Sequence, residues 1–199
     1  MISVNIYDFL KQEFYNKIDM KIPAKQLLDE LKKITNENLE FVENLLNLSA
    51  EKLNFRNSER SWSILECLEH LNLYGKFYIP EINKRIKNSD IKPTELFSSG
   101  ILGNYFAKSM LPKDNLKKMK TFKSMNPIHS DLDKRVLTEF IAQQKQMIHL
   151  LNDAENIDLN KIKTSISISK LIKLKLGDTF RFVIYHNQRH IEQAKRILY

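Results

Sequence analysis

The chain has 199 residues, 42% of them hydrophobic and 28% charged, which is an ordinary composition for one globular domain spanning residues 1–199. Four Gly and five Pro leave few breaks in the chain, so long helices are favoured and an all-β fold is excluded. The formal net charge is +8, but much of it is lysine on expected solvent-facing helix surfaces, so we expect no nucleic-acid partner.

A single cysteine, Cys67, cannot form an intramolecular disulfide, so nothing indicates an oxidising compartment. Asp8 and Lys11 lie where a signal peptide needs an uninterrupted apolar core. No later apolar run has the length that a membrane span requires. We therefore expect a cytoplasmic protein with no membrane partner.

The first long helix is expected over residues 23–46, beginning at Pro23, a residue suited to the first turn. Its apolar residues recur at spacings of three and four, the pattern of one buried helix face, apart from a polar interval at residues 35–38. These apolar positions are Leu27, Leu28, Leu31, Ile34, Phe41, Val42, Leu45 and Leu46. A shorter leading helix is expected before it, from Ile6, Phe9, Leu10 and Phe14.

The second helix has a clear start at Ser63. The Ser63 hydroxyl can accept from the Glu66 N–H while the Glu66 carboxylate accepts from the Ser63 N–H, which is a capping box. The apolar spacing continues to about Lys87, through Ile64, Leu65, Leu68, Leu71, Phe77 and Ile82. Pro80 falls inside this helix and is expected to kink it.

Residues 88–127 have a weaker pattern that is broken by Pro and Gly, with one short helix expected at residues 101–110. A loop of this length in a compact domain usually has a function or covers something. Lysines gather at residues 113–123, where Phe122 is the lone aromatic residue, so a solubilising surface is favoured over a nucleic-acid site. Steeply salt-dependent association would indicate the nucleic-acid alternative.

The third long helix is expected to begin with a cap formed by Ser130 and Asp133. Its apolar stripe comprises Val136, Leu137, Phe140, Ile141, Gln144, Ile148 and Leu151. Residues 165–176 alternate imperfectly between polar and apolar, which predicts extended chain that Gly177 stops. Asp178 is then expected to cap a last helix that continues to the carboxyl terminus. Four long helices predict an all-α four-helix bundle.

Three of the five histidines are candidate metal ligands. His186 and His190 are four residues apart on the last helix, so both rings can reach one ion. The spacing alone is too common to identify a site. His70 lies on the apolar second helix, where a metal ligand and a core histidine with ordinary hydrogen-bond partners are both consistent with the pattern.

Two segments around these histidines resemble the DinB/YfiT-like superfamily. Residues 62–71 read WSILECLEHL, and residues 176–178 (LGD) are followed by residues 186–193, which read HNQRHIEQ. The resemblance implies an up-down-down-up four-helix bundle with short extra helices in the long loop. It also implies one divalent metal ion, most often zinc or nickel, bound by three histidines that fall on His70, His186 and His190.

Three imidazoles leave an open coordination position for water or a substrate thiol. The resemblance implies a thiol S-transferase that joins a low-molecular-weight thiol such as bacillithiol to an electrophile. A metal-dependent hydrolase and a non-catalytic, stress-associated metal-binding protein are the alternatives. The sequence decides neither the metal nor the oligomeric state, with a homodimer as one option.

Other residues near the histidines have two interpretations each. Glu66 is expected in the capping box rather than beside a metal ligand. Arg189 could meet a substrate carboxylate or form an internal salt bridge, and Gln193 could orient a ring or touch substrate. Cys67 is expected to be a small buried hydrophobe and Trp62 to pack the start of its helix. His129 and His149 are expected to face solvent.

Overall fold

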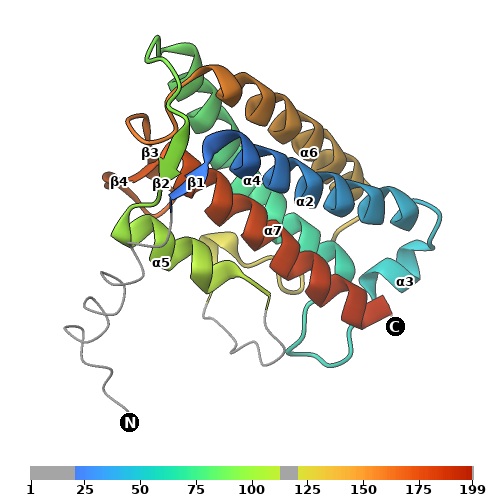
Figure 1. Ribbon diagram of the computed structural model, residues 1–199. Coiled ribbons are helices and arrows are strands. Elements are labelled where there is room, and N and C mark those ends of the chain that lie inside the picture. Colours follow the sequence, from blue (N-terminus) through green and yellow to red (C-terminus); the bar gives the residue numbers. More distant parts are fainter. Residues whose placement is uncertain (1–20, 113–120, 199) are drawn as a thin grey trace.

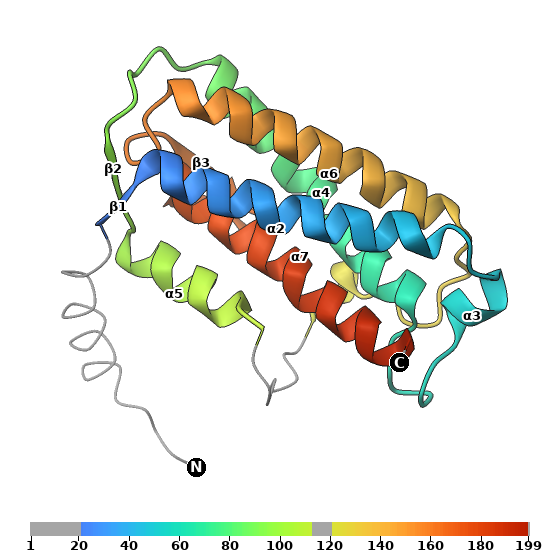
Figure 2. The ribbon, with the colours of Figure 1, turned by 45° about the vertical axis from the view of Figure 1, so that its right-hand side comes forward.

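The computed structural model describes residues 21–112 and 121–198, and its four long helices form an all-α bundle (Figures 1 and 2). α2 packs against α6 on one side and α7 on the other, and α4 packs against the same two helices. Both views show α2 and α7 running one way and α4 and α6 the other, which is the expected up-down-down-up arrangement. The bounds are α2 Ala24–Leu45, α4 Ile64–Lys87, α6 Arg135–Asp153 and α7 Leu176–Leu198.

Shorter elements close the ends and one flank of the bundle. α5 (Ile101–Met110) lies against α7 and has the bounds that the sequence predicts, while α3 (Ala50–Asn54) was not predicted. β1 (Lys21–Pro23) pairs antiparallel with β2 (Leu96–Ser98), and β3 (Lys163–Ile166) forms an antiparallel hairpin with β4 (Ser169–Lys175). Two 3-10 turns complete the description, η2 (Lys123–Met125) and η3 (Ala154–Asn156).

The buried face of α2 includes polar residues. Thr35 and Asn38 are 0% and 2% exposed, so the interval that interrupts the apolar stripe is still part of the core face. The Thr35 hydroxyl satisfies its hydrogen bonding within the helix by donating to the Leu31 carbonyl. Phe41 is only half-buried and Leu46 is exposed, so these two residues contribute less to the core than the spacing predicts.

The predicted capping box at the start of α4 is confirmed. The Glu66 N–H donates to Ser63 Oγ, and the Ser63 N–H donates to a Glu66 carboxylate oxygen. Pro80 lies inside the helix, and the kink expected there stays a prediction. This cap fixes where α4 begins, and therefore the level at which His70 lies in the bundle.

The predicted cap of the third helix is wrong. α6 begins at Arg135, and Lys134, at the N-cap position before it, makes no side-chain capping bond. The Asp133 carboxylate accepts from both the backbone N–H and the guanidinium of Arg135, so it is occupied by its own neighbour. Of the predicted stripe, Ile148 is only half-buried, and Met147 takes the core position beside it.

The last helix starts earlier than predicted, at Leu176, so Asp178 lies in its first turn and is not its cap. The Asp178 carboxylate accepts from the Ser99 hydroxyl, the Gly100 N–H and the Arg181 guanidinium. Burial is the largest influence on this group and raises the pKa of Asp178. The aspartate therefore ties the start of α5 to α7.

Gly177 was predicted to stop the extended segment; the strand ends at Lys175, and Gly177 lies in the first turn of α7. A Cβ at this position would lie 2.5 Å from a ring carbon of Phe97. The glycine thus lets the buried Phe97 of β2 pack directly against the helix backbone.

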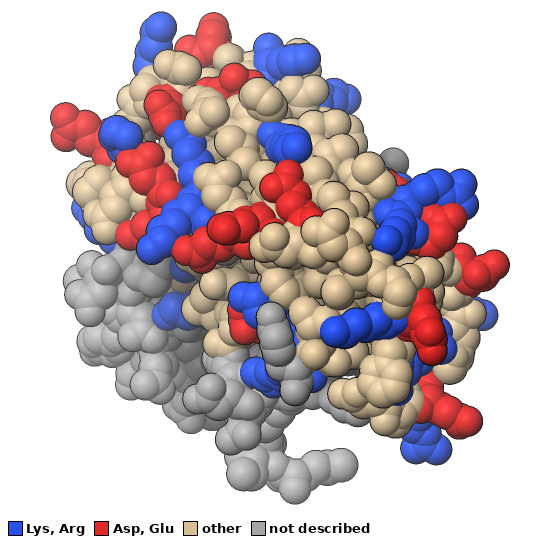
Figure 3. Space-filling model, turned by 90° about the vertical axis from the view of Figure 1, so that its right-hand side faces the viewer, with Lys and Arg blue, Asp and Glu red and all other residues tan. Residues whose placement is uncertain are grey.

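No helix in the described residues has the length and hydropathy that a membrane crossing needs. The face in Figure 3 carries Lys and Arg side chains intermixed with Asp and Glu over its described part. The predicted leading helix and all of the lysine-rich segment except residues 121–123 lie outside the described residues.

Candidate metal centre

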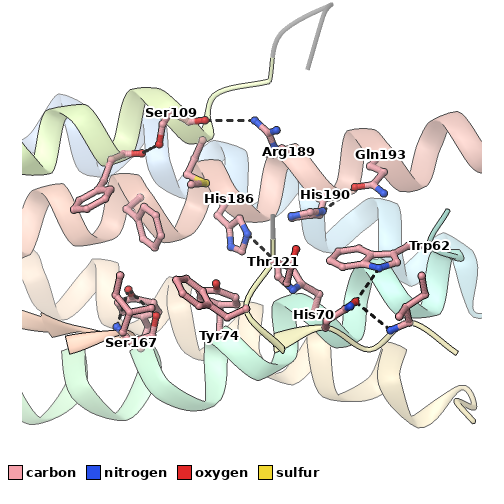
Figure 4. A pocket seen from close by; sticks show the side chains of 18 of the residues that line it. Trp62, His70, Tyr74, Ser109, Thr121, Ser167, His186, Arg189, His190 and Gln193 are labelled. Atoms are coloured by element: carbon pink, nitrogen blue, oxygen red, sulfur yellow. Dashed lines mark hydrogen bonds between the residues drawn. The ribbon is translucent and has the colours of Figure 1, made fainter. Parts of the chain in front are cut away.

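The structure brings His70, His186 and His190 together between α4 and α7 (Figure 4). One nitrogen of each ring lies within 4.8 Å of the others, and His70 Nε2 is 3.1 Å from His186 Nε2. The antiparallel packing of α4 on α7 produces this meeting, since residues 116 positions apart share one level of the bundle. His186 and His190 present their rings side by side because they are one turn apart.

Two of the three imidazoles are oriented by hydrogen bonds from Nδ1. His70 Nδ1 donates to the Met125 carbonyl at 2.5 Å, and His190 Nδ1 donates to Gln193 Oε1 at 2.9 Å. Because both partners are oxygen acceptors, the proton of each neutral ring lies on Nδ1 and the lone pair on Nε2. This is the arrangement of metal-ligating histidines, whose other ring nitrogen is held by an outer hydrogen bond.

All three rings are held in the neutral form. Burial, opposed by the bond to Met125, lowers the pKa of His70 from 6.5 to about 4. Burial and the neighbouring His70 lower the pKa of His190 to about 3. Burial and the two other imidazoles lower the pKa of His186 well below its ordinary value. Neutral imidazole is the form that binds a metal ion.

The donor set fits a divalent metal ion. Two nitrogens bound to one tetrahedral zinc at about 2.0–2.1 Å lie roughly 3.3 Å apart, close to the separation of His70 Nε2 and His186 Nε2. Imidazole nitrogen suits zinc, nickel, copper and iron. Three protein ligands leave a further position for a small molecule, which is typical of catalytic rather than structural sites.

A pocket of about 850 Å³ opens onto the three histidines. Trp62 forms part of its wall, with its ring centre 4.7 Å from that of His70 and 5.5 Å from that of His190. Its indole N–H donates to Asn126 Oδ1 at 3.2 Å, which fixes the ring. Further aromatic side chains line the pocket: Tyr74, Tyr78, Tyr105, Phe106, Phe122 and Phe182.

Among the described residues that line the pocket, all the charged ones are basic. Arg60, Arg189 and Arg196 line it, and none of the described lining residues is Asp or Glu. Arg189 lies between the histidines and α5, where its guanidinium donates to the Ser109 carbonyl at 3.4 Å (Figure 4). Burial lowers the pKa of Arg189. The pocket therefore favours an anionic ligand.

The other residues that the sequence analysis considered near the histidines have structural roles or face solvent. Glu66 is buried and makes the capping box, a two-pronged ion pair with Arg56 and a bond from the His129 N–H, so its oxygens are turned to these groups. Burial opposes its ionisation, but these bonds lower the pKa of Glu66. Cys67 is fully buried in the core and burial raises its pKa, as expected of a small hydrophobe. His129 and His149 are exposed, as predicted.

Several residues of this site were missed from the sequence. Phe182 is four residues before His186 on the same helix, so helical spacing could have placed it in the pocket, as the spacing placed Tyr74 on the side of α4 that carries His70. Trp62 was assigned to helix packing and also contacts two of the histidine rings. The Met125 carbonyl had no sequence signal, because η2 reaches His70 from 55 residues away.

The fold and the site together define a helical-bundle protein with a three-histidine group at the base of an aromatic pocket. The sequence pattern of the DinB superfamily matches residues 30–194, and the chain belongs to this superfamily. The chain is also similar to the uncharacterized protein YuaE of Bacillus subtilis (strain 168), with 28% identity over 161 residues, which are 80% of this chain and 91% of that protein. No solved structure gives a significant match.

Proposed function

We propose that the protein binds one divalent metal ion, zinc or nickel, through His70, His186 and His190 and acts as a thiol S-transferase. The carrying observation is the convergence of three neutral imidazoles at the base of an 850 Å³ pocket. A bound divalent ion supplies a Lewis acid that holds a thiol sulfur in its reactive thiolate form. We place the reaction in the cytoplasm, where low-molecular-weight thiols are kept reduced.

The overall reaction is a substitution at carbon. The thiol sulfur forms a bond to the electrophilic carbon, the bond from that carbon to a leaving group such as halide breaks, and the leaving group departs with its electron pair. The thiol proton passes to solvent. Trp62 and the aromatic lining would surround the electrophile with apolar surface, while the hydrogen bonds from His70 and His190 hold the ligand rings in place.

The lining supports thiol chemistry over hydrolysis. A metal-dependent hydrolase usually adds a carboxylate or histidine base that takes a proton from water. The described lining contains no Asp or Glu, and its three histidines are the residues that we assign to the metal. A thiol, which loses its proton far more readily than water, needs no such base.

The test is conjugation of bacillithiol to an aryl chloride by the zinc-loaded protein, followed by mass spectrometry of the thioether. We expect thioether formation by the wild type, none above background by His186→Ala, and wild-type rates for His149→Ala, a matched histidine substitution on the exposed face of α6. Circular dichroism checks that each variant is folded.

Two results would contradict the proposal. One is unchanged turnover in folded His186→Ala protein, which would separate the reaction from the histidines. The other is absence of thioether from wild type with every thiol tried, together with unfolding of His186→Ala. That second pattern would indicate a metal with a purely structural role.

A further inference from the structure

The residues of α7 that line the pocket change in character along the helix. Phe182 comes one turn before His186, and Arg196 comes almost two turns after His190. Figure 4 shows the same order, with aromatic rings and Ser167 on one side of the histidines and Trp62 and Gln193 on the other. The three histidines therefore divide the pocket into two parts.

The first part is an aromatic arm, formed by Tyr74, Tyr78, Phe106 and Phe182. The ring of Phe182 lies 5.7 Å from that of Tyr78 and 6.2 Å from that of Phe106, measured between centres. Tyr74 and Tyr78 are stacked at 6.4 Å, and the Tyr78 hydroxyl is occupied because it accepts from the Ser167 N–H. The arm thus offers ring faces, and apolar molecules fit such a surface.

The second part is a cationic arm: Arg60 is two residues before Trp62 and Arg196 is three residues after Gln193, and all four line the pocket. Arg60 comes from the loop before α4 and Arg196 from the last turns of α7, so two distant segments each contribute one arginine to the lining of the same pocket. Both side chains are exposed, and neither forms an ion pair with any residue in the described ranges. Guanidinium groups bind carboxylates and phosphates through paired N–H donors.

We infer that the two arms receive different substrates: the cationic arm takes the acidic groups of an anionic thiol, and the aromatic arm takes the apolar body of the electrophile. This inference rests on the proposed transferase function and adds the substrate class that each arm selects. A metal ion with three neutral ligands would keep its full positive charge, so an anion would be attracted both by the two arginines and by the ion. The sulfur and the electrophilic carbon then meet at the histidines.

The first experiment measures binding to the zinc-loaded protein by calorimetry, with mercaptosuccinate and its dimethyl ester as probes. The two probes share one thiol skeleton and differ by two carboxylates. We expect the diacid to bind about ten-fold more tightly than the diester. The R60Q/R196Q double variant should lose about this factor for the diacid and leave diester binding unchanged. R135Q, at an exposed arginine outside the pocket lining, is the matched control.

The second experiment separates the arms by kinetics with an aryl chloride. We expect R60Q/R196Q to raise the KM for the anionic thiol and not for the electrophile. F106A should raise the KM for the electrophile and not for the thiol. These opposite effects would not follow from a general loosening of the fold, which would change both constants together.

The outcomes distinguish this inference from the function on which it rests. Equal Kd values for the two probes in wild type, or equal weakening of both in R60Q/R196Q, overturn the assignment of the arms while thiol binding stands. Binding of neither probe to zinc-loaded protein overturns the thiol function and the inference with it.

Discussion

Two clusters of buried polar side chains lie on α4 and α7, and they differ in where their hydrogen bonds go. Asn72 and Asn187 are two residues and one residue from His70 and His186, yet they turn toward α6. The Asn72 amide donates to the Val136 carbonyl at 3.0 Å, and the Asn187 amide donates to Gln144 Oε1 at 3.2 Å. These bonds join the helices of the bundle to one another.

The histidine cluster turns toward the pocket, and its inner nitrogens face one another. His70 carries its proton on Nδ1, so its Nε2 has only a lone pair to offer. That lone pair can accept a hydrogen bond from His186 Nε2, or both nitrogens can bind one cation. The two amide groups donate to α6 and so stabilise the fold. The inner nitrogens of the histidines face one another, where they can accept a shared ligand. The same two helices thus carry one face that bonds to α6 and one face that lines the pocket.

The largest expected effect is the loss of metal from a histidine variant. His190→Ala should weaken zinc binding more than about 100-fold, because it removes one of three ligands and not merely an outer support. Competition with a chromophoric chelator measures the affinity. His149→Ala should bind zinc as the wild type does, and wild-type affinity in His190→Ala would remove that residue from the site.

The pH dependence of the metal-free protein tests the histidine cluster without any ligand. In the unfolded chain each histidine takes up a proton near pH 6.5, whereas in the fold the pKa of His70 is about 4 and that of His190 about 3. The unfolded state therefore binds more protons between these values, so stability falls as the pH drops from about 6.5 to 4, by up to 1.4 kcal/mol per pH unit for each such histidine.

Urea unfolding of chelator-treated protein at a series of pH values measures this loss. His70→Gln should flatten the dependence, because one of the titrating groups is absent. A free energy of unfolding that stays constant from pH 7 to pH 4 would contradict the burial of neutral imidazoles.

Substitutions in the amide cluster should lower the stability of the fold and leave zinc binding unchanged. Gln144→Ala leaves the Asn187 amide without its acceptor and should cost about 1–3 kcal/mol of unfolding free energy while zinc affinity is kept. Gln146→Ala, at an exposed position of the same helix, is the control. If Gln144→Ala lost zinc with no loss of stability, the division between the two clusters would be wrong.

The smallest effect is expected at Gln193, which orients His190 without facing the metal. Gln193→Ala should weaken zinc binding about ten-fold with little change in stability, because the ring loses the acceptor of its Nδ1 proton. Gln188→Ala on the same helix and outside the pocket lining should change neither quantity. Equal affinities in the two variants would show that the bond to Gln193 does not support the site.

The features that the sequence predicted correctly are formed by residues close together in the chain. The capping box of Ser63 and Glu66 and the one-turn spacing of His186 and His190 depend on residues three or four apart, and both features are present in the structure. The start of α6 was misplaced because the Asp133 carboxylate bonds Arg135 rather than capping the helix. Competition between such local partners is not visible in a spacing.

The rest depends on residues that are distant in the chain. The Met125 carbonyl reaches His70 across 55 positions, and Arg60 meets the pocket through a loop whose path no periodicity describes. Asp178 was predicted to cap a helix because its sequence neighbours show no other partner. Its partners in the structure, Ser99 and Gly100, are nearly 80 residues away. Pocket shape and charge therefore required the fold.

The most direct test of the three-histidine site is elemental analysis of untagged protein that has been equilibrated with zinc and desalted. We predict one zinc ion per chain in the wild type and none in a folded variant that combines His70→Ala and His186→Ala. Folded wild-type protein that retains no divalent ion would contradict the assignment of these histidines as a metal site.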